Sequence, residues 1–111
     1  MPAAGLDDTL QALADPARRA VVDLLSRSPR RAGELAAALG LPPPAVSRHL
    51  RVLRRARIVR EEGIEEDARV RIYKLQKPPF ATLRGWLDGV ESYWGDQLQA
   101  FKAHAEKKGR A

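Results

Sequence analysis

Residues 33–56 read GELAAALGLPPPAVSRHLRVLRRA, which is two short helical patterns separated by a glycine and a run of prolines. The apolar side chains of the first pattern share one face, and they are Leu35, Ala36 and Leu39. Gly40 suits the end of this helix, because glycine readily adopts the left-handed backbone of a C-terminal turn. Pro44 suits the first turn of the second helix, where its missing N–H has no helical partner. Two helices joined by a short turn predict a helix-turn-helix over 33–56.

The second of these helices, over 44–56, has an apolar side and a cationic side. Val46, Leu50 and Leu53 recur at i, i+4 and i+7, which is the spacing of a core-facing stripe. At about 100° per residue, the opposite side holds Pro44, Arg48, Arg51 and Arg55, with Ala45 beside them and Ser47 and His49 at the edges of the core stripe. The second helix of such a motif enters the major groove of DNA. We therefore expect a DNA-facing surface that starts at Pro44, with base contacts from Ala45, Ser47 and Arg48 and phosphate contacts from His49, Arg51 and Arg55.

The charges are placed unevenly along the chain. Twenty Lys and Arg residues against 14 Asp and Glu give a net charge of +6, which favours a polyanionic partner such as nucleic acid. Residues 42–60 hold six arginines and no acid, whereas 61–67 hold five acids and no base. A solvated face is the ordinary interpretation of such runs, but a basic block on one helix favours a surface that faces phosphate.

Length and composition limit the class of protein. A chain of 111 residues predicts a single domain, 1–111, and 44% hydrophobic residues exclude wholesale disorder. The absence of cysteine excludes disulfides, thiolate zinc sites and cysteine nucleophiles. There is no basic-then-apolar leader and no apolar run near the roughly 18–20 residues that span a bilayer. We therefore expect a cytoplasmic protein that does not contact a membrane.

Two helices precede the helix-turn-helix, and a hairpin and a long helix follow it. Asp15 and Pro16 mark the start of the second helix, because Asp caps a helix and Pro suits its first position. Alternating apolar residues over 70–75 predict the second strand of the hairpin, which Pro78 and Pro79 end. The predicted ranges are 6–14 and 17–26 for the two helices, 58–75 for the hairpin and 80–107 for the last helix.

The last helix carries large apolar side chains at intervals of three and four residues, both tryptophans among them. Trp86, Trp94 and Phe101 could line an effector pocket, but tryptophan is enriched at the centres of buried interfaces, which favours packing between two copies. The expected dimer contacts are Leu6 and Leu10 of the first helix with Leu83, Leu87, Val90, Trp94, Leu98 and Phe101 of the last.

Three segments make the chain similar to a known family, and they are 13–19 (LADPARR), 33–36 (GELA) and 45–53 (AVSRHLRVL). They resemble the ArsR/SmtB family of bacterial transcription repressors, and the resemblance extends over about residues 6–105. It implies an α+β, mostly helical fold, namely a winged helix-turn-helix with a two-stranded β-hairpin wing and a long terminal dimerisation helix. It also implies that the first and last helices pair across a homodimer and that operator binding represses transcription.

The chain departs from this family at its metal sites. The thiolate motif of the family's metal sensors is missing from 34–39. The last helix offers only Asp96, His104 and Glu106, at the wrong spacing for the family's other metal site. We therefore expect no metal and no other cofactor.

Two helix ends also differ from the family pattern. Pro42 and Pro43 replace the usual Ser or Thr at the start of the recognition helix, which removes a side-chain cap. Arg57 replaces the usual glycine at its exit, at a cost of about 1 kcal/mol if its φ is positive. Arg18 and Arg19, near the start of the second helix, have two interpretations: contact with the DNA backbone, or a solvated helix face.

The wing has an unusual charge for a DNA contact. Phosphates would repel its tip acids Glu65, Glu66 and Asp67, so these acids either pair with arginines or stand off the duplex. Arg71 is expected to reach a phosphate from the strand.

These patterns predict a sequence-specific DNA-binding repressor that binds a partly palindromic operator as a homodimer. An unidentified small-molecule effector between the terminal helices remains open. The alternative is a winged-helix protein-interaction module without specific DNA binding, which the acidic hairpin would suit. No Gly-rich phosphate loop and no nucleophile with an adjacent base occur, so we do not expect an enzyme or a catalytic residue.

Overall fold

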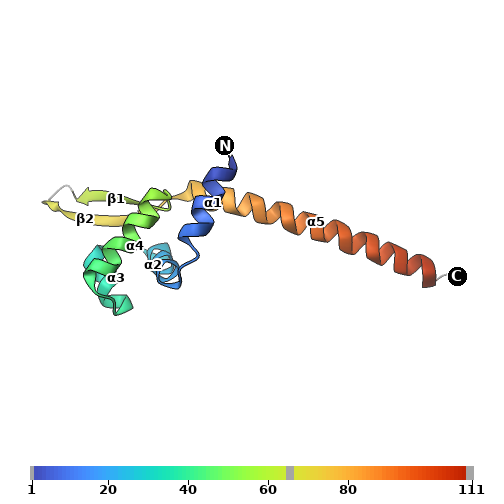
Figure 1. Cartoon of the computed structure of the whole chain (residues 1–111), viewed down its shortest axis with the longest axis horizontal. Helices are drawn as coiled ribbons and strands as arrows, with labels where there is room; N and C mark the ends of the chain where they lie inside the picture. Colours follow the sequence, from blue (N-terminus) through green and yellow to red (C-terminus); the bar gives the residue numbers. More distant parts are fainter. Residues whose placement is uncertain (1, 65–66, 110–111) are drawn as a thin grey trace.

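The computed structural model describes residues 2–64 and 67–109, which form five helices and one β-hairpin (Figure 1). The elements are α1 (Pro2–Ala12), α2 (Pro16–Arg27), α3 (Ala32–Leu39), α4 (Pro43–Arg55), β1 (Val59–Ile64), β2 (Asp67–Leu75) and α5 (Lys77–Gly109). The fold is α+β and mostly helical, with a hairpin directly after a helix-turn-helix, so the predicted fold class is confirmed. A body of α1–α4 and the hairpin lies at one end, and α5 extends away from it to give a length of 75 Å (Figure 1).

The core lies where α2, α3 and α4 meet the base of the hairpin. The residues of α3 and α4 predicted to face inward are buried, namely Leu35, Ala36, Val46, Leu50 and Leu53, and Leu39 is half-buried at the edge. The other buried apolar residues are Ala12, Val21, Leu25, Ile58 and Val59. Burying an aliphatic side chain of this size stabilises a fold by roughly 1.5–3 kcal/mol, so the cluster holds α4 against α3 and leaves its other side free.

Local signals start α2 and end α3 as the sequence predicts. The Asp15 carboxylate caps α2, because it accepts hydrogen bonds from the backbone N–H groups of Ala17 at 2.7 Å and Arg18 at 3.2 Å. The hydrogen bond from the Arg18 N–H, with that from Ala17, lowers the pKa of Asp15, since both favour the charged carboxylate. Gly40 ends α3 in the left-handed conformation, with a φ of 64°.

Helix α1 begins and ends four and two residues earlier than the predicted range of 6–14. Its buried residues are Thr9 and Ala12, whereas Leu10 is 40% exposed and Leu6 is half-buried. The Thr9 hydroxyl donates to the carbonyl of Gly5 at 2.9 Å, so its burial leaves no unpaired donor. Small inward side chains allow α1 to lie close to the body, and they leave its leucines toward the outside.

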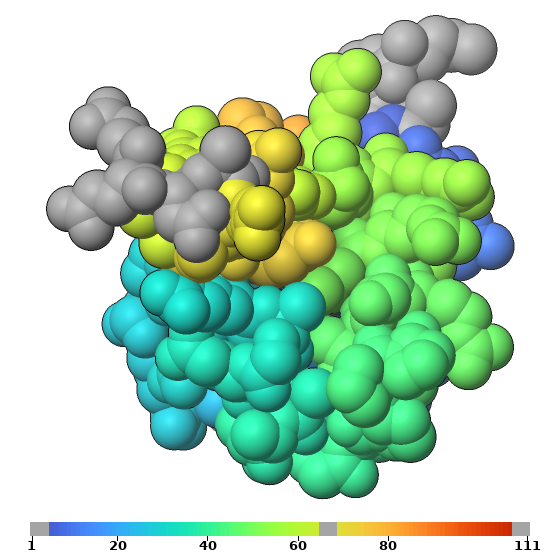
Figure 2. All heavy atoms as spheres, turned by 90° about the vertical axis from the view of Figure 1, so that its left-hand side faces the viewer, coloured from blue at the N-terminus to red at the C-terminus, as the bar shows by residue number. Residues whose placement is uncertain are grey.

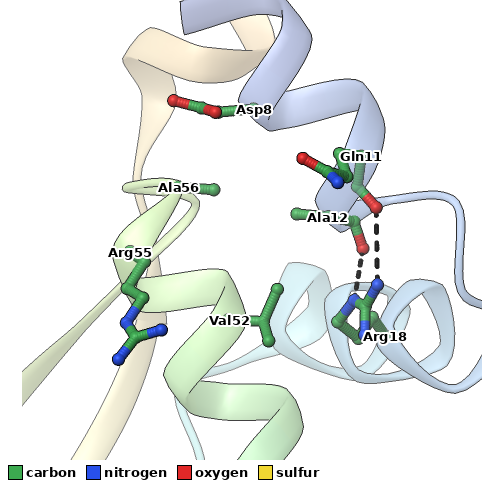
Figure 3. Close-up of a pocket in the computed structure, with 7 residues that line it drawn as sticks. All are labelled: Asp8, Gln11, Ala12, Arg18, Val52, Arg55 and Ala56. Atoms are coloured by element: carbon green, nitrogen blue, oxygen red, sulfur yellow. Dashed lines mark hydrogen bonds between the residues drawn. The ribbon is translucent and has the colours of Figure 1, made fainter.

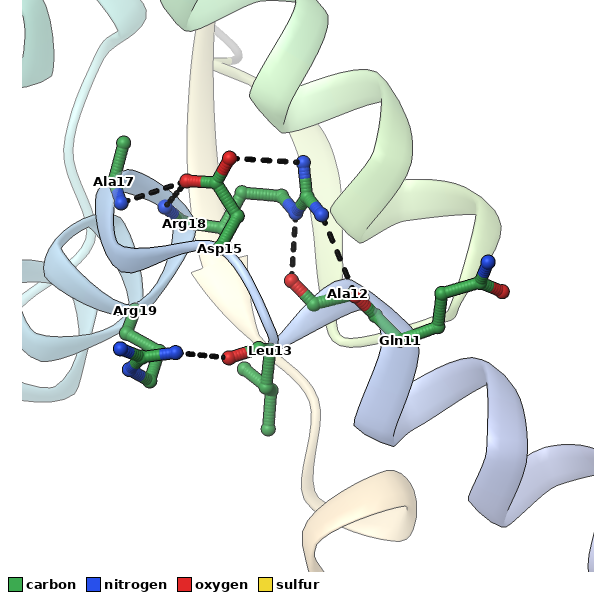
Figure 4. A network of polar contacts seen from close by, with 7 residues as sticks. All are labelled: Gln11, Ala12, Leu13, Asp15, Ala17, Arg18 and Arg19. Carbon is green, nitrogen blue, oxygen red and sulfur yellow. Dashed lines mark hydrogen bonds and ion pairs between the residues drawn. The ribbon is translucent and has the colours of Figure 1, made fainter.

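Arg18 and Arg19 fasten the end of α1 to the start of α2 (Figure 4). Arg18 Nε donates to the carbonyl of Ala12 at 2.6 Å, and Arg18 Nη2 donates to that of Gln11 at 3.4 Å. Arg19 Nη1 donates to the carbonyl of Leu13 at 2.7 Å. The last carbonyls of a helix have no intrahelical partner, so these guanidinium groups supply the missing donors. The two arginines thus have a structural role that the sequence did not indicate.

The hairpin is antiparallel, with Val59 opposite Leu75 and Glu61 opposite Tyr73. The backbone of Arg30, just before α3, exchanges hydrogen bonds with that of Tyr73 in both directions, at 3.2 and 2.8 Å. Tyr73 and Leu75 also pack against the core. The base of the wing is therefore joined to the body by backbone and by side chains.

Helix α5 begins at Lys77, three residues before its predicted start. Pro78 and Pro79 lie in its first turn, where their missing N–H groups need no partner, so they start the helix as well as end the strand. Neither α5 nor any other described helix is apolar enough to cross a membrane. Its large exposed apolar residues are Trp86, Leu87, Val90, Tyr93, Trp94, Leu98 and Phe101.

The exit from α4 carries backbone strain at Arg57, whose φ is 61° as the family comparison of this position suggested. Replacing Arg57 with glycine is expected to raise the free energy of unfolding by about 1 kcal/mol, because a left-handed backbone disfavours a side chain with a Cβ. Urea unfolding with an unchanged slope measures the difference.

Gly40→Ala is the matched control, since Gly40 has nearly the same φ and an added Cβ would meet no atom within 4 Å. Its expected effect is a loss of stability of similar size, about 1 kcal/mol. Gly40→Ala should be destabilised in either case. If Arg57→Gly were destabilised as well, the Arg57 side chain would make contacts that stabilise the fold by more than the strain of its backbone costs.

Candidate nucleic-acid interface

Helix α4 begins without a side-chain cap, as the prolines of the sequence indicate. Pro42 takes the cap position, and Pro43 and Pro44 follow as the first helical residues with no N–H groups to satisfy. The carbonyl of Pro42 accepts hydrogen bonds from the backbone N–H groups of Ala45 at 3.0 Å and Val46 at 3.3 Å. The prolines thus reduce the number of donors that a cap would otherwise satisfy.

Helix α4 lies beside α3 on the face of the molecule that also carries the hairpin (Figure 2). We call its predicted DNA-facing side the outer face of α4, in which Pro44, Ser47, Arg48, Arg51 and Arg55 are exposed and Ala45 and His49 are half-buried. Among the side chains that the structure describes, no carboxylate pairs with Arg48, Arg51 or Arg55. Their guanidinium groups remain available to phosphates or to guanine edges.

An open cleft of about 330 Å³ follows one edge of this outer face. Arg18 of α2 forms one wall, and Ala45, Arg48, His49 and Val52 of α4 form the other. His49 is half-buried in this wall, which agrees with its expected place at the edge of the core stripe. The cleft separates α2 from the first half of α4, so the start of α4 is accessible from this side as well.

A larger open cleft, of about 390 Å³, lies between α1 and the end of α4 (Figure 3). Arg18 points toward the end of α1, where carbonyls hold it, whereas the Arg55 guanidinium extends away from α1 (Figure 3). Asp8 and Gln11 of α1 line the opposite wall. Arg55 therefore extends from the end of α4 without a contact to α1.

The wing carries a three-residue ion cluster that reaches α4. Glu61 Oε2 lies 2.9 Å from Arg54 Nη1, and Glu61 Oε1 lies 3.3 Å from Arg71 Nε. The two arginines come from α4 and β2, so one carboxylate links the helix to both strands. Arg71, a predicted phosphate contact, is exposed as expected, but it is also paired within the protein.

A second carboxylate pairs only within the hairpin. Glu62 Oε1 lies 2.7 Å from Arg60 Nη2, and Glu62 Oε2 lies 3.0 Å from Lys74 Nζ. The hydrogen bond from Lys74, with the charge of Arg60, lowers the pKa of Glu62. Cross-strand pairing therefore neutralises part of the acidic run in the wing. The expected behaviour of Glu65, Glu66 and Asp67 at the wing tip lies outside the residues whose side chains the structure describes.

The pairing of Glu61 with Arg54 was not predicted from the sequence. It requires the chain to turn back after α4, so that β1 runs along the helix it has just left. Gln76 holds this turn, because its Nε2 donates to the carbonyls of Arg57 at 3.1 Å and Val59 at 3.3 Å. A run of bases followed by a run of acids signals that some pairs form, but it does not specify which.

The described side chains contain no group of three or more His, Cys, Asp or Glu residues that could hold a metal ion. The geometry instead combines an exposed cationic helix face, small side chains at its start and a neighbouring hairpin. These are the parts with which a winged helix-turn-helix binds duplex DNA.

Two sequence comparisons agree with this geometry. Residues 15–61, from the cap of α2 into β1, match the family described as "Bacterial regulatory protein, arsR family". The chain is also 39% identical over 105 residues to the HTH-type transcriptional regulator Rv2034 of Mycobacterium tuberculosis, and the match covers 93% of this chain and 91% of that relative.

Solved structures give the same result. One similar crystal structure is that of an ArsR family transcriptional regulator, RHA00566, whose sequence is 34% identical to this chain. The two structures superpose with a TM-score of 0.72, and the match covers 82% of this chain and 91% of that chain. An ArsR-like transcriptional regulator from Rhodococcus sp. RHA1 shares the fold, with a TM-score of 0.77 at 24% identity and coverage of 94% and 93%. The chain therefore belongs to the ArsR family of bacterial regulatory proteins, and it is a DNA-binding transcriptional regulator with a winged helix-turn-helix fold.

Proposed function

We propose that this regulator is a homodimeric repressor that places one α4 helix in each of two major grooves of a partly palindromic operator. Successive major grooves on one side of a duplex are about 34–36 Å apart, which sets the expected spacing of the half-sites. The observation that carries this proposal is the outer face of α4, where three exposed arginines have no partner among the described carboxylates. Repression follows if the occupied operator overlaps a promoter, and the site of action is then the cytoplasm, where bacterial DNA lies.

The roles of the contacts follow from side-chain size and position. Ala45 and Ser47 are small and near the start of α4, so they allow the helix to approach base edges closely. Arg48 is the first arginine of the outer face, and its fork matches O6 and N7 of guanine. The remaining contacts to phosphate are assigned to His49, Arg51, Arg55 and Arg71, and Pro44 lies where the helix enters the groove.

The contact with the second copy of the chain is assigned to the exposed apolar side of α5, together with α1. On the single chain Leu87 and Val90 are 38% and 37% exposed, and Trp94, Leu98 and Phe101 are 60–73% exposed. Leu83 and Leu6 are half-buried and Leu10 is exposed, and α1 packs on α5. An apolar row of this length is rare on a monomer, because water would cover it at a free-energy cost. Two copies would bury it.

An effector, if one regulates the protein, is assigned to the space between the terminal helices. An opening of about 310 Å³ lies there, lined by Gly5 and Thr9 of α1 and by Pro78, Pro79 and Thr82 of α5. Gln76, which holds the turn after α4, is also in its wall. A ligand in this place would act on the junction between the dimer helices and the DNA-binding body.

Selection of bound sequences from a random duplex pool, with and without added cell metabolites, tests this function. The expected result is a palindromic consensus with two half-sites about one helical turn apart, bound with a steep loss of affinity as salt rises. A metabolite fraction that abolishes the enrichment would reveal an effector. A pool without enrichment and with weak salt dependence would instead support the protein-interaction module.

A further inference from the structure

Glu61 occupies the junction between the recognition helix and the wing. Only 21% of its side chain is exposed, and each carboxylate oxygen faces a different arginine, at 2.9 Å for Arg54 and 3.3 Å for Arg71. The side chains of Arg54 and Arg71 are about half exposed, at 52% and 53%. The carboxylate is thus the more enclosed member of the cluster, and the two cations are the more exposed.

The surroundings of Glu61 are fixed by the fold. Tyr73 lies opposite Glu61 in the strand register, and its backbone is bonded to Arg30 in both directions. Burial raises the pKa of the Tyr73 hydroxyl, and the negative charge of Glu61 adds to this effect. Glu61 on β1 is therefore paired with β2, and β2 is anchored to the body. Its partner Arg54 belongs to α4, the helix that carries the outer face.

We propose that Glu61 is a positioning residue that determines DNA specificity, because it sets the wing against α4 and so fixes how α4 lies in the groove, while it also weakens the phosphate contacts that Arg54 and Arg71 make on any sequence. This inference rests on the proposed function, in which Arg48 reads bases and the wing approaches the duplex. Contacts to phosphate add the same affinity on every sequence. A carboxylate that shares two cations lowers this common affinity equally on all DNA. The effect of Glu61 on specificity therefore comes from the position that the wing gives to α4.

Glu62 offers a matched control on the same strand. It also binds two cations, Arg60 and Lys74, but both belong to the hairpin and neither belongs to α4. Glu61→Gln and Glu62→Gln therefore make the same change in net charge one residue apart. Only the first variant releases the recognition helix from the wing.

The experiment measures binding of the full chain to its selected operator and to random duplex of equal length, over a series of salt concentrations. Glu61→Gln is expected to raise the affinity for random DNA by about 3–10-fold and to steepen the salt slope by about 1 for each arginine released to a phosphate. The released phosphate contacts raise both affinities by the same factor and leave their ratio unchanged. The ratio of operator affinity to random-DNA affinity is nevertheless expected to fall by roughly fivefold, because a wing that no longer holds α4 in register weakens the operator complex alone. Glu62→Gln is expected to leave this ratio within about twofold.

A second variant separates positioning from general loss of structure. Arg54→Gln removes the α4 end of the link without adding a free cation, so it should lower the operator ratio without raising random-DNA affinity. In an Arg54→Gln background, Glu61→Gln should change the ratio much less than it does alone, because the residues act through one contact. This coupling remains measurable even if each variant melts at a lower temperature.

Equal effects of Glu61→Gln and Glu62→Gln would overturn the inference, because charge alone would then explain both. Additive effects of Glu61→Gln and Arg54→Gln would overturn it as well. A wild-type chain without operator preference would instead reject the proposed function, so the two failures are distinguishable.

Discussion

Replacing Trp94 with glutamate is expected to convert the proposed dimer to monomers and to lower operator affinity by roughly 10²–10⁴-fold. Trp94 is 60% exposed on the single chain and lies midway along the apolar row of α5. A charge at this position would have to be buried without a partner in the dimer, which is costly. The separated monomers would then bind each half-site independently and lose the high effective concentration that a linked second half-site provides.

Light scattering measures the change in mass, and titration with full operators and with single half-sites measures the change in affinity. The affinity for a single half-site should change little, because Trp94 belongs to α5, which extends away from the body that holds α4 (Figure 1). Ser92→Glu is the matched control, since it adds the same charge about 160° around the helix from Trp94. A Trp94→Glu protein that remains dimeric, with unchanged operator affinity, would place the interface elsewhere on the molecule.

Replacing Arg48 with alanine is expected to cost ~1–3 kcal/mol of operator affinity at each half-site, a factor of about 5–150. Arg48 is exposed in the first half of α4 and has no carboxylate partner among the described residues. Its guanidinium can therefore donate two hydrogen bonds to the edge of a guanine, and truncation to alanine removes both of them. The affinity for random DNA should fall much less.

Arg55→Ala provides the comparison, because Arg55 is also exposed but lies at the end of α4. As a phosphate contact it should weaken operator and random DNA alike and reduce the salt slope by about 1. If Arg48→Ala also weakened both DNAs equally, Arg48 would be a phosphate contact, and base reading would rest on Ala45 and Ser47.

Residues close together in the chain made the helix-turn-helix predictable. Val46, Leu50 and Leu53 share a face by helical periodicity alone, and a helix must bury such a face wherever it lies. The opposite face, with Arg48 and Arg51, then follows from geometry. Asp15 and Gly40 act on backbone groups within a few residues of themselves, so their roles were also visible.

The role of α1 was less predictable, because its burial depends on contacts with other elements. Leucines mark an apolar side of this helix, yet Thr9 and Ala12 are the residues buried against the body. Arg18 and Arg19 appear in the sequence as free cations near a DNA-binding motif. Only the turn between α1 and α2, as the fold sets it, brings the carbonyls of Ala12 and Leu13 within their reach.

The sequence by itself therefore determined the recognition helix, its exposed cations and the hairpin that follows, because periodicity, capping and turn residues act over one or two helical turns. The tertiary structure alone decided which of the many charges meet. Glu61 binds Arg54 and Arg71 because a left-handed turn at Arg57 lays β1 beside α4 and the strand register brings β2 alongside. An ion pair depends on a few ångströms of separation, and that distance is set by the packing of elements and not by their order in the chain.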